Sequence, residues 1–355
     1  MIDPQIYMAL YYVAILVFSI IFYEDYKPYR GEHYLGIVRL WVVLLVLFIA
    51  LRPLTDKFGF GDTLVYERHF AFAYGNEIDW SAADIGFELI QHYVSPYSFT
   101  LFAGIFALIY VLPQYYSTKK LFRNYSDIAF LILISSLSFI AYGVNGMRNG
   151  AAMSLTLFGM VINPLPVKAV SFLLGASIHK SALLPIIAYG LTKIFNKSYF
   201  YLCLWSVVLF ISLFYANTLS NLIMSIDFFN DDRLSGYVNG SFEDMNTVMR
   251  TGFRYDFLLY SFVPIYIGYR YIKNNKKDMV FKSMFNTYLI TNAFWLMTVY
   301  VPYNNRFAYL SWFLYPVLLT YPYAKDFEHY NGENLKMLKK IVSLNCIFTI
   351  LMWLK

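Results

Sequence analysis

Long apolar runs recur along the whole sequence, and this feature limits the folds that are open to it. Hydrophobic residues make up 59% of the 355 residues and charged residues only 14%, whereas a soluble domain carries about a quarter charged residues. Apolar runs of this length and number predict transmembrane helices. We therefore expect an all-α polytopic membrane protein, and the mean hydropathy of +0.50 agrees with that class.

The apolar runs predict ten to twelve transmembrane helices. The pair between residues 167 and 195 is the weakest, because both halves are short and Pro185 interrupts the second. The alternatives for this pair are two short helices and a partly re-entrant segment. The predicted segments are 5–22, 35–51, 99–117, 127–143, 147–162, 167–178, 181–195, 199–216, 256–272, 281–300, 305–320 and 338–354.

No soluble domain is separable, so residues 1–355 are expected to form a single integral membrane domain. Two loops on one side are long, at about 52–98 and 217–255, and loops of this length are often functional. Within the first loop, Ala82–Tyr97 is apolar enough to lie along the membrane interface as an amphipathic helix.

Lysines and arginines are distributed differently between the loops. With these spans, most of the 17 lysines share one set of alternating loops, which the positive-inside rule makes cytoplasmic: Lys27, Lys119, Lys120, Lys168, Lys193, Lys197, Lys273, Lys276, Lys277, Lys282, Lys325, Lys336, Lys339 and Lys340. Most of the 11 arginines lie in or beside the opposite, outer loops: Arg52, Arg68, Arg148, Arg233, Arg250, Arg254 and Arg306. Because arginine binds phosphate and carboxylate with two parallel hydrogen bonds, we expect an outward-facing site for a phosphate-bearing or acidic ligand.

Two groups of polar residues at outer helix ends are candidates for chemistry. The first combines Arg52 with Asp62 and Tyr66, where a carboxylate could act as a general base beside an arginine clamp. The alternative is a solvated loop whose ions pair with each other. The second group is the turn Asn145-Gly146-Met147-Arg148-Asn149. Its arginine stands at the start of an apolar helix, where a charge is costly and often functional. Arginine can also reach the interface from such a position without a role in binding.

Further candidates lie at three other outer turns. His179 and Lys180 follow the first half of the weak helical pair, and histidine can act as a base or a phosphate ligand near neutral pH. The alternative for His179 is a structural role, which we weigh equally with a catalytic one. Arg250 and Arg254 are four residues apart and would share one face of a helix. Arg306 begins another apolar segment, where the alternative function is to cap a helix end.

The sequence argues against several classes of protein. It contains no Walker A motif for nucleotide hydrolysis and no Gly-x-Ser-x-Gly nucleophile elbow. No set of His, Cys, Asp and Glu has the spacing of metal ligands, so neither a metal nor another cofactor is expected. No basic patch interleaves with aromatic residues in a soluble segment, so nucleic-acid binding is not expected.

The candidate residues occur in an order that resembles the EpsG family of Wzy-like polysaccharide polymerases. The resemblance extends across most of the chain, and Asn149 stands where many relatives have glutamine. It rests on five pieces: Arg52 with Asp62 and Tyr66, Gly86-Phe87-Glu88, Asn145-Gly146-Met147-Arg148, His179-Lys180-Ser181-Ala182-Leu183, and Asn305-Arg306 before Tyr309.

The resemblance implies a membrane enzyme that polymerises lipid-linked sugar units. Such enzymes are similar to membrane glycosyltransferases of the C type. They act at the outer face of the bacterial cytoplasmic (inner) membrane and join oligosaccharide repeat units carried on undecaprenyl diphosphate. The partners implied are this lipid-linked oligosaccharide, membrane lipid and a chain-length regulator protein. The product could be an O-antigen, a capsule or an exopolysaccharide.

Such a reaction needs cations for the diphosphate and a base for the acceptor hydroxyl. For the diphosphate and glycan we expect Arg148, Arg254 and Arg306, then Arg52 and Arg250, with Tyr66 and Lys180 beside them. For the base we expect Asp62 or His179, with Glu88 third; the sequence does not decide between them. Since arginines suffice for the diphosphate, the reaction is expected to be metal-independent.

Three other functions compete with the polymerase. A flippase or secondary transporter of lipid-linked glycan is expected to place ionisable residues in the middle of its helices. A membrane O-acyltransferase is expected to carry its His or Arg in the inner half of the membrane. An O-antigen ligase shares the lipid-diphosphate chemistry, and only the EpsG-like order of residues separates it from a polymerase.

Overall fold

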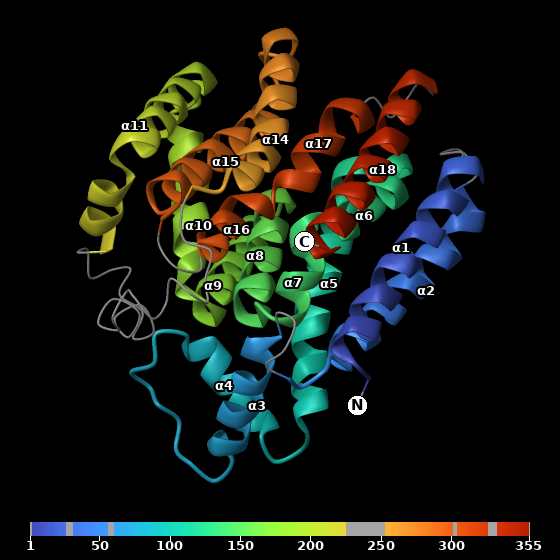
Figure 1. The fold of residues 1–355 in the computed structure, drawn as a ribbon, viewed down its shortest axis with the longest axis vertical. Coiled ribbons are helices and arrows are strands. Elements are labelled where there is room, and N and C mark those ends of the chain that lie inside the picture. The colour runs from blue at the N-terminus through green and yellow to red at the C-terminus, as the bar shows by residue number, and fades with distance from the viewer. Residues whose placement is uncertain are drawn as a thin grey trace. The chain divides into compact units, whose positions relative to one another are not determined.

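A computed structural model describes residues 2–25, 31–55, 60–224, 253–300, 304–325 and 332–354 (Figure 1). Most of these residues lie in helices, and the described ranges contain no strand. The predicted all-α class is therefore confirmed.

The helices follow the apolar segments of the sequence, with two helices added between residues 52 and 98. In chain order they are α1 (Pro4–Asp25), α2 (Gly31–Ala50), α3 (Gly61–Ala73), α4 (Ile85–Val94), α5 (Phe99–Phe122), η1 (Arg123–Tyr125), α6 (Ser126–Ile134), α7 (Leu137–Val144), α8 (Met147–Val161), α9 (Leu165–Ile178), η2 (Lys180–Ala182), α10 (Leu183–Ile194), α11 (Ser198–Met224), α14 (Tyr255–Asn274), α15 (Met279–Met297), α16 (Asn305–Trp312), α17 (Tyr315–Ala324) and α18 (Gly332–Leu354).

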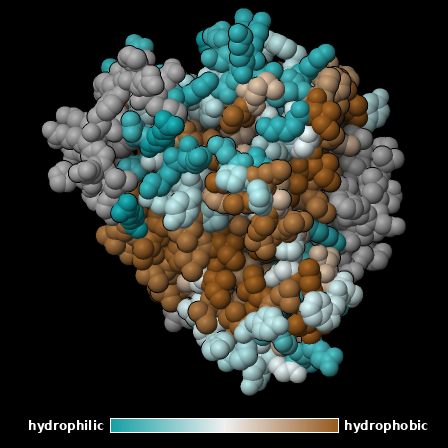
Figure 2. All heavy atoms as spheres, turned by 180° about the vertical axis from the view of Figure 1, so that it is seen from behind, coloured by the Kyte–Doolittle hydropathy of each residue, from teal (hydrophilic) through white to brown (hydrophobic). Residues whose placement is uncertain are grey.

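Four of the described segments are long and apolar enough to cross a membrane: Pro4–Ile21, Phe99–Ile134, Ser198–Tyr215 and Gly332–Leu354. Two further apolar helices are shorter. Large apolar side chains point outward from these helices, and Figure 2 shows such side chains gathered over much of the visible face. The chain is a polytopic membrane protein, while the number of ten to twelve spans stays a prediction.

The chain divides into two compact units. Unit 1 comprises Met1–Ile186 and Pro316–Lys355, and unit 2 comprises Ile187–Tyr315. In unit 1, α5 packs against α2, α6 and α8, and α8 packs against α9. In unit 2, α15 packs against α11, α14 and α16. A single membrane domain stays a prediction.

The first of the two long segments, residues 52–98, contains two helices. A helix is present within Ala82–Tyr97, as α4, and its place along the membrane interface stays a prediction. Helix α3 was not expected, because only the narrow stripe of Thr63, Tyr66 and Phe70 is buried along its length. Of the second long segment, residues 217–224 continue α11, and residues 225–252 lie outside the described residues.

The predicted span at 127–143 is divided into α6 and α7 by two serines. The hydroxyl of Ser135 donates to the carbonyl of Ile132, and that of Ser136 donates to the carbonyl of Leu133. Such bonds to the preceding turn compete with the regular helical pattern. The break exposes carbonyl groups at the end of α6 that have no partner within their own helix.

Neighbouring helices of unit 1 supply donors for these carbonyls. The hydroxyl of Tyr11 in α1 donates to Ile134 at 2.5 Å, and that of Thr349 in α18 donates to Ser135 at 3.0 Å. An unpaired backbone group inside a bilayer costs several kcal/mol. The broken helix is therefore tolerable only because α1 and α18 pack against it.

Unit 2 is held together in part by a buried polar chain across three helices. The Nε1 of Trp205 in α11 donates to Oδ1 of Asn292 in α15 at 2.8 Å. The amide of Asn292 donates to the hydroxyl of Ser311 in α16 at 3.0 Å. Because apolar contact gives little net drive between helices in lipid, such bonds contribute specificity to their packing.

We expect Asn292→Ala to destabilise unit 2, because it leaves the buried N–H of Trp205 without its acceptor. The expected loss is about 1–3 kcal/mol of unfolding free energy, measured by denaturation in detergent. Ser206→Ala is the control, since this exposed hydroxyl bonds only to its own helix. Equal stability of the Asn292 variant and the wild type would contradict the assignment.

Candidate functional site

The polar residues of unit 1 gather around one carboxylate. Oδ2 of Asp84 lies 2.9 Å from Nη1 of Arg148 and 3.1 Å from Nδ1 of His179. Oδ1 of Asp84 accepts the backbone N–H of Lys180 at 2.9 Å. We call these four residues the Asp84 cluster. It joins the turn before α4 to the start of α8 and the end of α9.

Asp84 reaches the cluster because α4 lies unusually close to α9. A Cβ at position 86 would stand 2.9 Å from the backbone carbonyl carbon of Ser177 and closer still to its hydroxyl. Only glycine avoids this overlap, so Gly86 permits the contact between α4 and α9. The sequence motif that begins at Gly86 thus has a packing function that places Asp84.

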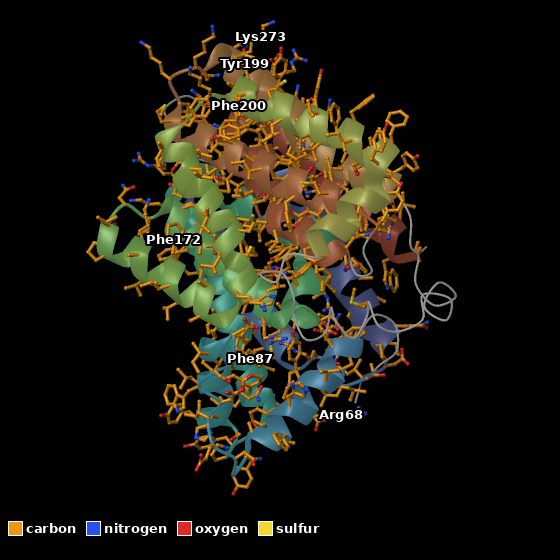
Figure 3. The ribbon with its side chains drawn as sticks, turned by 90° about the vertical axis from the view of Figure 1, so that its left-hand side faces the viewer. Arg68, Phe87, Phe172, Tyr199, Phe200 and Lys273 are labelled. Carbon is orange, nitrogen blue, oxygen red and sulfur yellow. The ribbon has the colours of Figure 1, made fainter. Side chains whose placement is uncertain are left out.

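Arg148 is the second residue of α8, where a cation opposes the helix dipole. The carboxylate of Asp84 supplies the opposite charge. The guanidinium also lies over the rings of Phe87, at 5.0 Å from the centroid, and Tyr66, at 5.8 Å. Stacking on aromatic rings holds a guanidinium in one plane. Phe87, labelled in Figure 3, is buried and packs on Phe102 and Phe106 of α5.

His179 directly follows α9, at the turn that the sequence predicted between the two short helices. Its backbone is extended (φ −154°, ψ 116°), and its N–H still bonds to Gly175. A Cβ at position 175 would lie 3.0 Å from the carbonyl oxygen of Ala152 in α8. The close approach of α8 and α9 therefore brings His179 to the same carboxylate as Arg148. The side chain of His179 remains 18% exposed, so part of the ring is accessible.

The charges of the cluster act on one another. Burial tends to raise the pKa of Asp84, but the hydrogen bond and charge of His179, the charge of Arg148 and the Lys180 N–H together lower it below its ordinary value. Asp84 is therefore an anion at neutral pH. Burial raises the pKa of nearby Glu88 above its ordinary value, against the opposing charge of Arg148.

The structure places Arg52 inside the protein, where its side chain is 5% exposed. Its Nε donates to the carbonyl of Ile49 at 3.0 Å and its Nη1 to that of Val144 at 2.5 Å. These bonds supply donors to carbonyl groups at the C-terminal ends of α2 and α7, which lack partners within their own helices. Burial lowers the pKa of Arg52 to about 10, so it stays charged near neutral pH.

Asp62 lies in the first turn of α3, half-buried. Its backbone N–H donates to Oδ1 of Asn145 at 2.9 Å, which ties α3 to the turn before α8. Two pieces of the sequence motif are thereby joined. Tyr66, one turn further along α3, is buried beneath the guanidinium of Arg148.

The remaining candidate arginines belong to unit 2. Arg254 forms two 2.8 Å hydrogen bonds with the carboxylate of Asp256, and its guanidinium lies 3.7 Å from the ring centroid of Phe257. Arg306 is the second residue of α16 and is half-buried. Arg250 lies outside the described residues. A role of these arginines in binding stays a prediction.

Within unit 1 the cluster and the lysines lie at opposite helix ends. Phe87 packs on Phe102 near the start of α5, whereas Lys120 is near the end of that helix. At about 1.5 Å per residue, the 18 positions between them span about 27 Å, close to the thickness of a bilayer core. Helix α9 shows the same separation, because Lys168 lies near its start and His179 of the cluster lies at its end.

A model of the EpsG family matches residues 38–355. The chain belongs to the EpsG family. Searches of curated proteins and of solved structures gave no match. Together with the apolar helices, the family supports a membrane protein with a general role like that of polysaccharide polymerases.

In this EpsG-family protein, four separate pieces of the motif meet in unit 1. They are Asp62 with Tyr66, Gly86-Phe87-Glu88, the turn that ends in Arg148, and His179-Lys180. Asp84 was not among the predicted site residues. It stands two positions before Gly86 in an acidic segment, and the only local signal was an aspartate directly before an apolar helix.

We expect Gly86→Ala to destabilise the protein by about 1–3 kcal/mol, because the new methyl group forces α4 away from α9. The measurement is thermal unfolding in detergent. Gly190→Ala is the matched control: nothing lies within 4 Å of its Cβ position, and alanine favours the helix there. If both substitutions had the same effect, the close approach at Gly86 would not matter for stability.

We expect Glu88→Gln to raise the melting temperature at pH 7 and to leave it unchanged below about pH 4. A carboxyl whose pKa is raised in the folded protein contributes stability when protonated, and loses that contribution as the pH rises through its folded pKa. Glutamine keeps the neutral form at every pH. A melting temperature that fell at pH 7 would show that the ionised carboxylate is stabilising.

Proposed function

We propose that the protein joins oligosaccharide repeat units carried on undecaprenyl diphosphate into a surface polysaccharide. The observation that carries this proposal is the shared carboxylate of Asp84. It brings Arg148, a cation suited to phosphate, and His179, a group suited to accept a proton, to within hydrogen-bonding distance of one oxygen atom. A diphosphate and an acceptor hydroxyl require these two groups side by side.

The proposed reaction is a glycosyl transfer. The acceptor hydroxyl of a lipid-linked repeat unit attacks the anomeric carbon of the growing chain. The bond between that carbon and the diphosphate oxygen breaks, and its electron pair leaves with undecaprenyl diphosphate. The hydroxyl proton passes to the base and then to water. The product is the chain, longer by one unit, on the lipid of the acceptor.

Arg148 is the first choice for the diphosphate, because negative charge grows on the leaving oxygen as the bond breaks. The ring of Tyr66 lies beneath its guanidinium, and the backbone N–H of Lys180 bonds to the same carboxylate as Arg148. Arg254, Arg306 and Arg250 are proposed as further ligands of the diphosphate or glycan on the ground of the sequence resemblance. The bonds of Arg52 to helix carbonyls support a structural contribution to the same site. His179 is the first choice for the base, ahead of Asp62 and Glu88.

We place the reaction at the outer face of the bacterial cytoplasmic membrane. The support is that the cluster and the cytoplasmic lysines lie at opposite ends of α5, and that lysine-rich loops favour the inside. The proposed likeness to C-type membrane glycosyltransferases is supported by the sequence resemblance. A chain-length regulator remains a proposed partner.

The proposal predicts that purified protein in nanodiscs converts lipid-diphosphate-linked repeat units into a ladder spaced by one repeat, with or without EDTA. Arg148→Ala should lower the rate about 10²–10³-fold, as the loss of one preorganised donor does elsewhere. Arg148→Lys should also be impaired, because lysine keeps the charge but not the planar stacking on Phe87. Products are resolved by gel electrophoresis.

The matched control is Arg68→Ala, an exposed arginine of the same segment. Figure 3 shows Arg68 apart from Phe87, the ring over which Arg148 lies. This variant should retain the wild-type ladder. A folded wild-type protein that binds the lipid without forming a ladder would overturn the polymerase. Transfer of one glycan to a different acceptor would then indicate a ligase, and movement of the lipid across liposomes a flippase.

A further inference from the structure

Asp84 was given no function by the sequence, yet each of its carboxylate oxygens is engaged by the residues of the candidate site. Oδ2 serves both the guanidinium of Arg148 and the ring of His179, and Oδ1 serves the backbone of Lys180. The side chain is 11% exposed. A surface ion pair would be far more open to solvent, so this arrangement is part of the interior of the site.

We infer that Asp84 is a positioning residue that selects the tautomer of His179 and points its Nε2 toward the substrate. Because the carboxylate of Asp84 can only accept a hydrogen bond when ionised, the hydrogen between the two side chains must belong to Nδ1. In the neutral ring, Nε2 is then the unprotonated nitrogen. The contact with Asp84 is made at Nδ1, and 18% of the His179 side chain is exposed.

The backbone is held by the same carboxylate. Lys180 directly follows His179, and its N–H donates to Oδ1 at 2.9 Å. One side chain therefore fixes the ring and the peptide next to it. An aspartate behind a histidine base contributes by orientation and by stabilising the protonated ring, without taking up the proton itself. This inference rests on the polymerase proposed above and names how its base is prepared.

Arg148 strengthens the arrangement. Its positive charge keeps Asp84 ionised, and therefore an acceptor. As the leaving diphosphate gains charge, Arg148 faces two anions, Asp84 and the phosphate. The ring of His179 gains a proton in the same step, so Asp84 then stabilises the new positive charge. Asp84 thus links the cation at the leaving group to the base at the acceptor.

The test uses full-length protein in nanodiscs with ¹⁵N-labelled histidine, at a pH where the ring is neutral. The ¹⁵N shifts show which ring nitrogen carries the proton, and the spectrum of His179→Gln assigns the signal among the five histidines. We expect the proton on Nδ1 in the wild type. In Asp84→Asn the amide can donate to Nδ1, so the proton should move to Nε2.

The kinetic arm measures ladder formation by Asp84→Asn. We expect kcat to fall about 10²–10⁴-fold, the size of effect that a wrong tautomer produces, without a rise in KM for the lipid-linked unit. Glu77→Gln and His92→Gln are the controls: the first is an exposed carboxylate of the same segment, and the second a histidine of α4 outside the cluster. Both should behave as wild type.

A wild-type ring protonated only on Nε2, or a tautomer that does not change in Asp84→Asn, would overturn the inference. A loss confined to KM would do the same, since it would assign Asp84 to binding alone. The wild-type spectrum decides even if the variant does not fold. If no ladder forms at all, the polymerase is wrong, while the spectra still decide the function of Asp84.

Discussion

A carboxylate at the end of three packed helices remains charged in this protein because donors from separate segments surround it. Removing an anion from water costs several kcal/mol unless it is paired and hydrogen-bonded. Asp84 meets that condition only when α4, the start of α8 and the end of α9 are all in place. The geometry of the candidate site is consequently determined by helix packing in unit 1 more than by the flexible reach of any one side chain.

Close backbone packing makes this possible. Gly86 brings α4 against α9, and Gly175 brings α9 against α8. Hydrogen-bond donors held by such contacts need little reorganisation when charge develops. Preorganised donors of this kind are a main source of electrostatic stabilisation in enzymes. The same principle applies to the broken helix α6–α7, where partners on α1 and α18 satisfy the exposed carbonyls.

The sequence predicted most of the helices well, because helix formation in apolar segments depends on local composition. The sidedness of the loops stays a prediction. Arg148 and His179 were also predicted, since a charge at an apolar helix end is unusual. Asp84 was not, because its partners lie 64 and 95 positions away and nothing local distinguishes it from the other acids of that segment. Arg52 resembles the other outer arginines in sequence, and only the packing of α2 against α7 reveals that it bonds to helix ends.

The short length of α9 has a consequence for the surrounding lipid. Its 14 residues span about 21 Å, less than the roughly 30 Å of a bilayer core. Leu165, Val170 and Leu173 on this helix are exposed, so acyl chains meet a short apolar surface there. A bilayer relieves such hydrophobic mismatch by thinning locally. Phosphate-bearing headgroups beside α9 would then lie closer to the centre of the membrane, nearer to the level of Arg148.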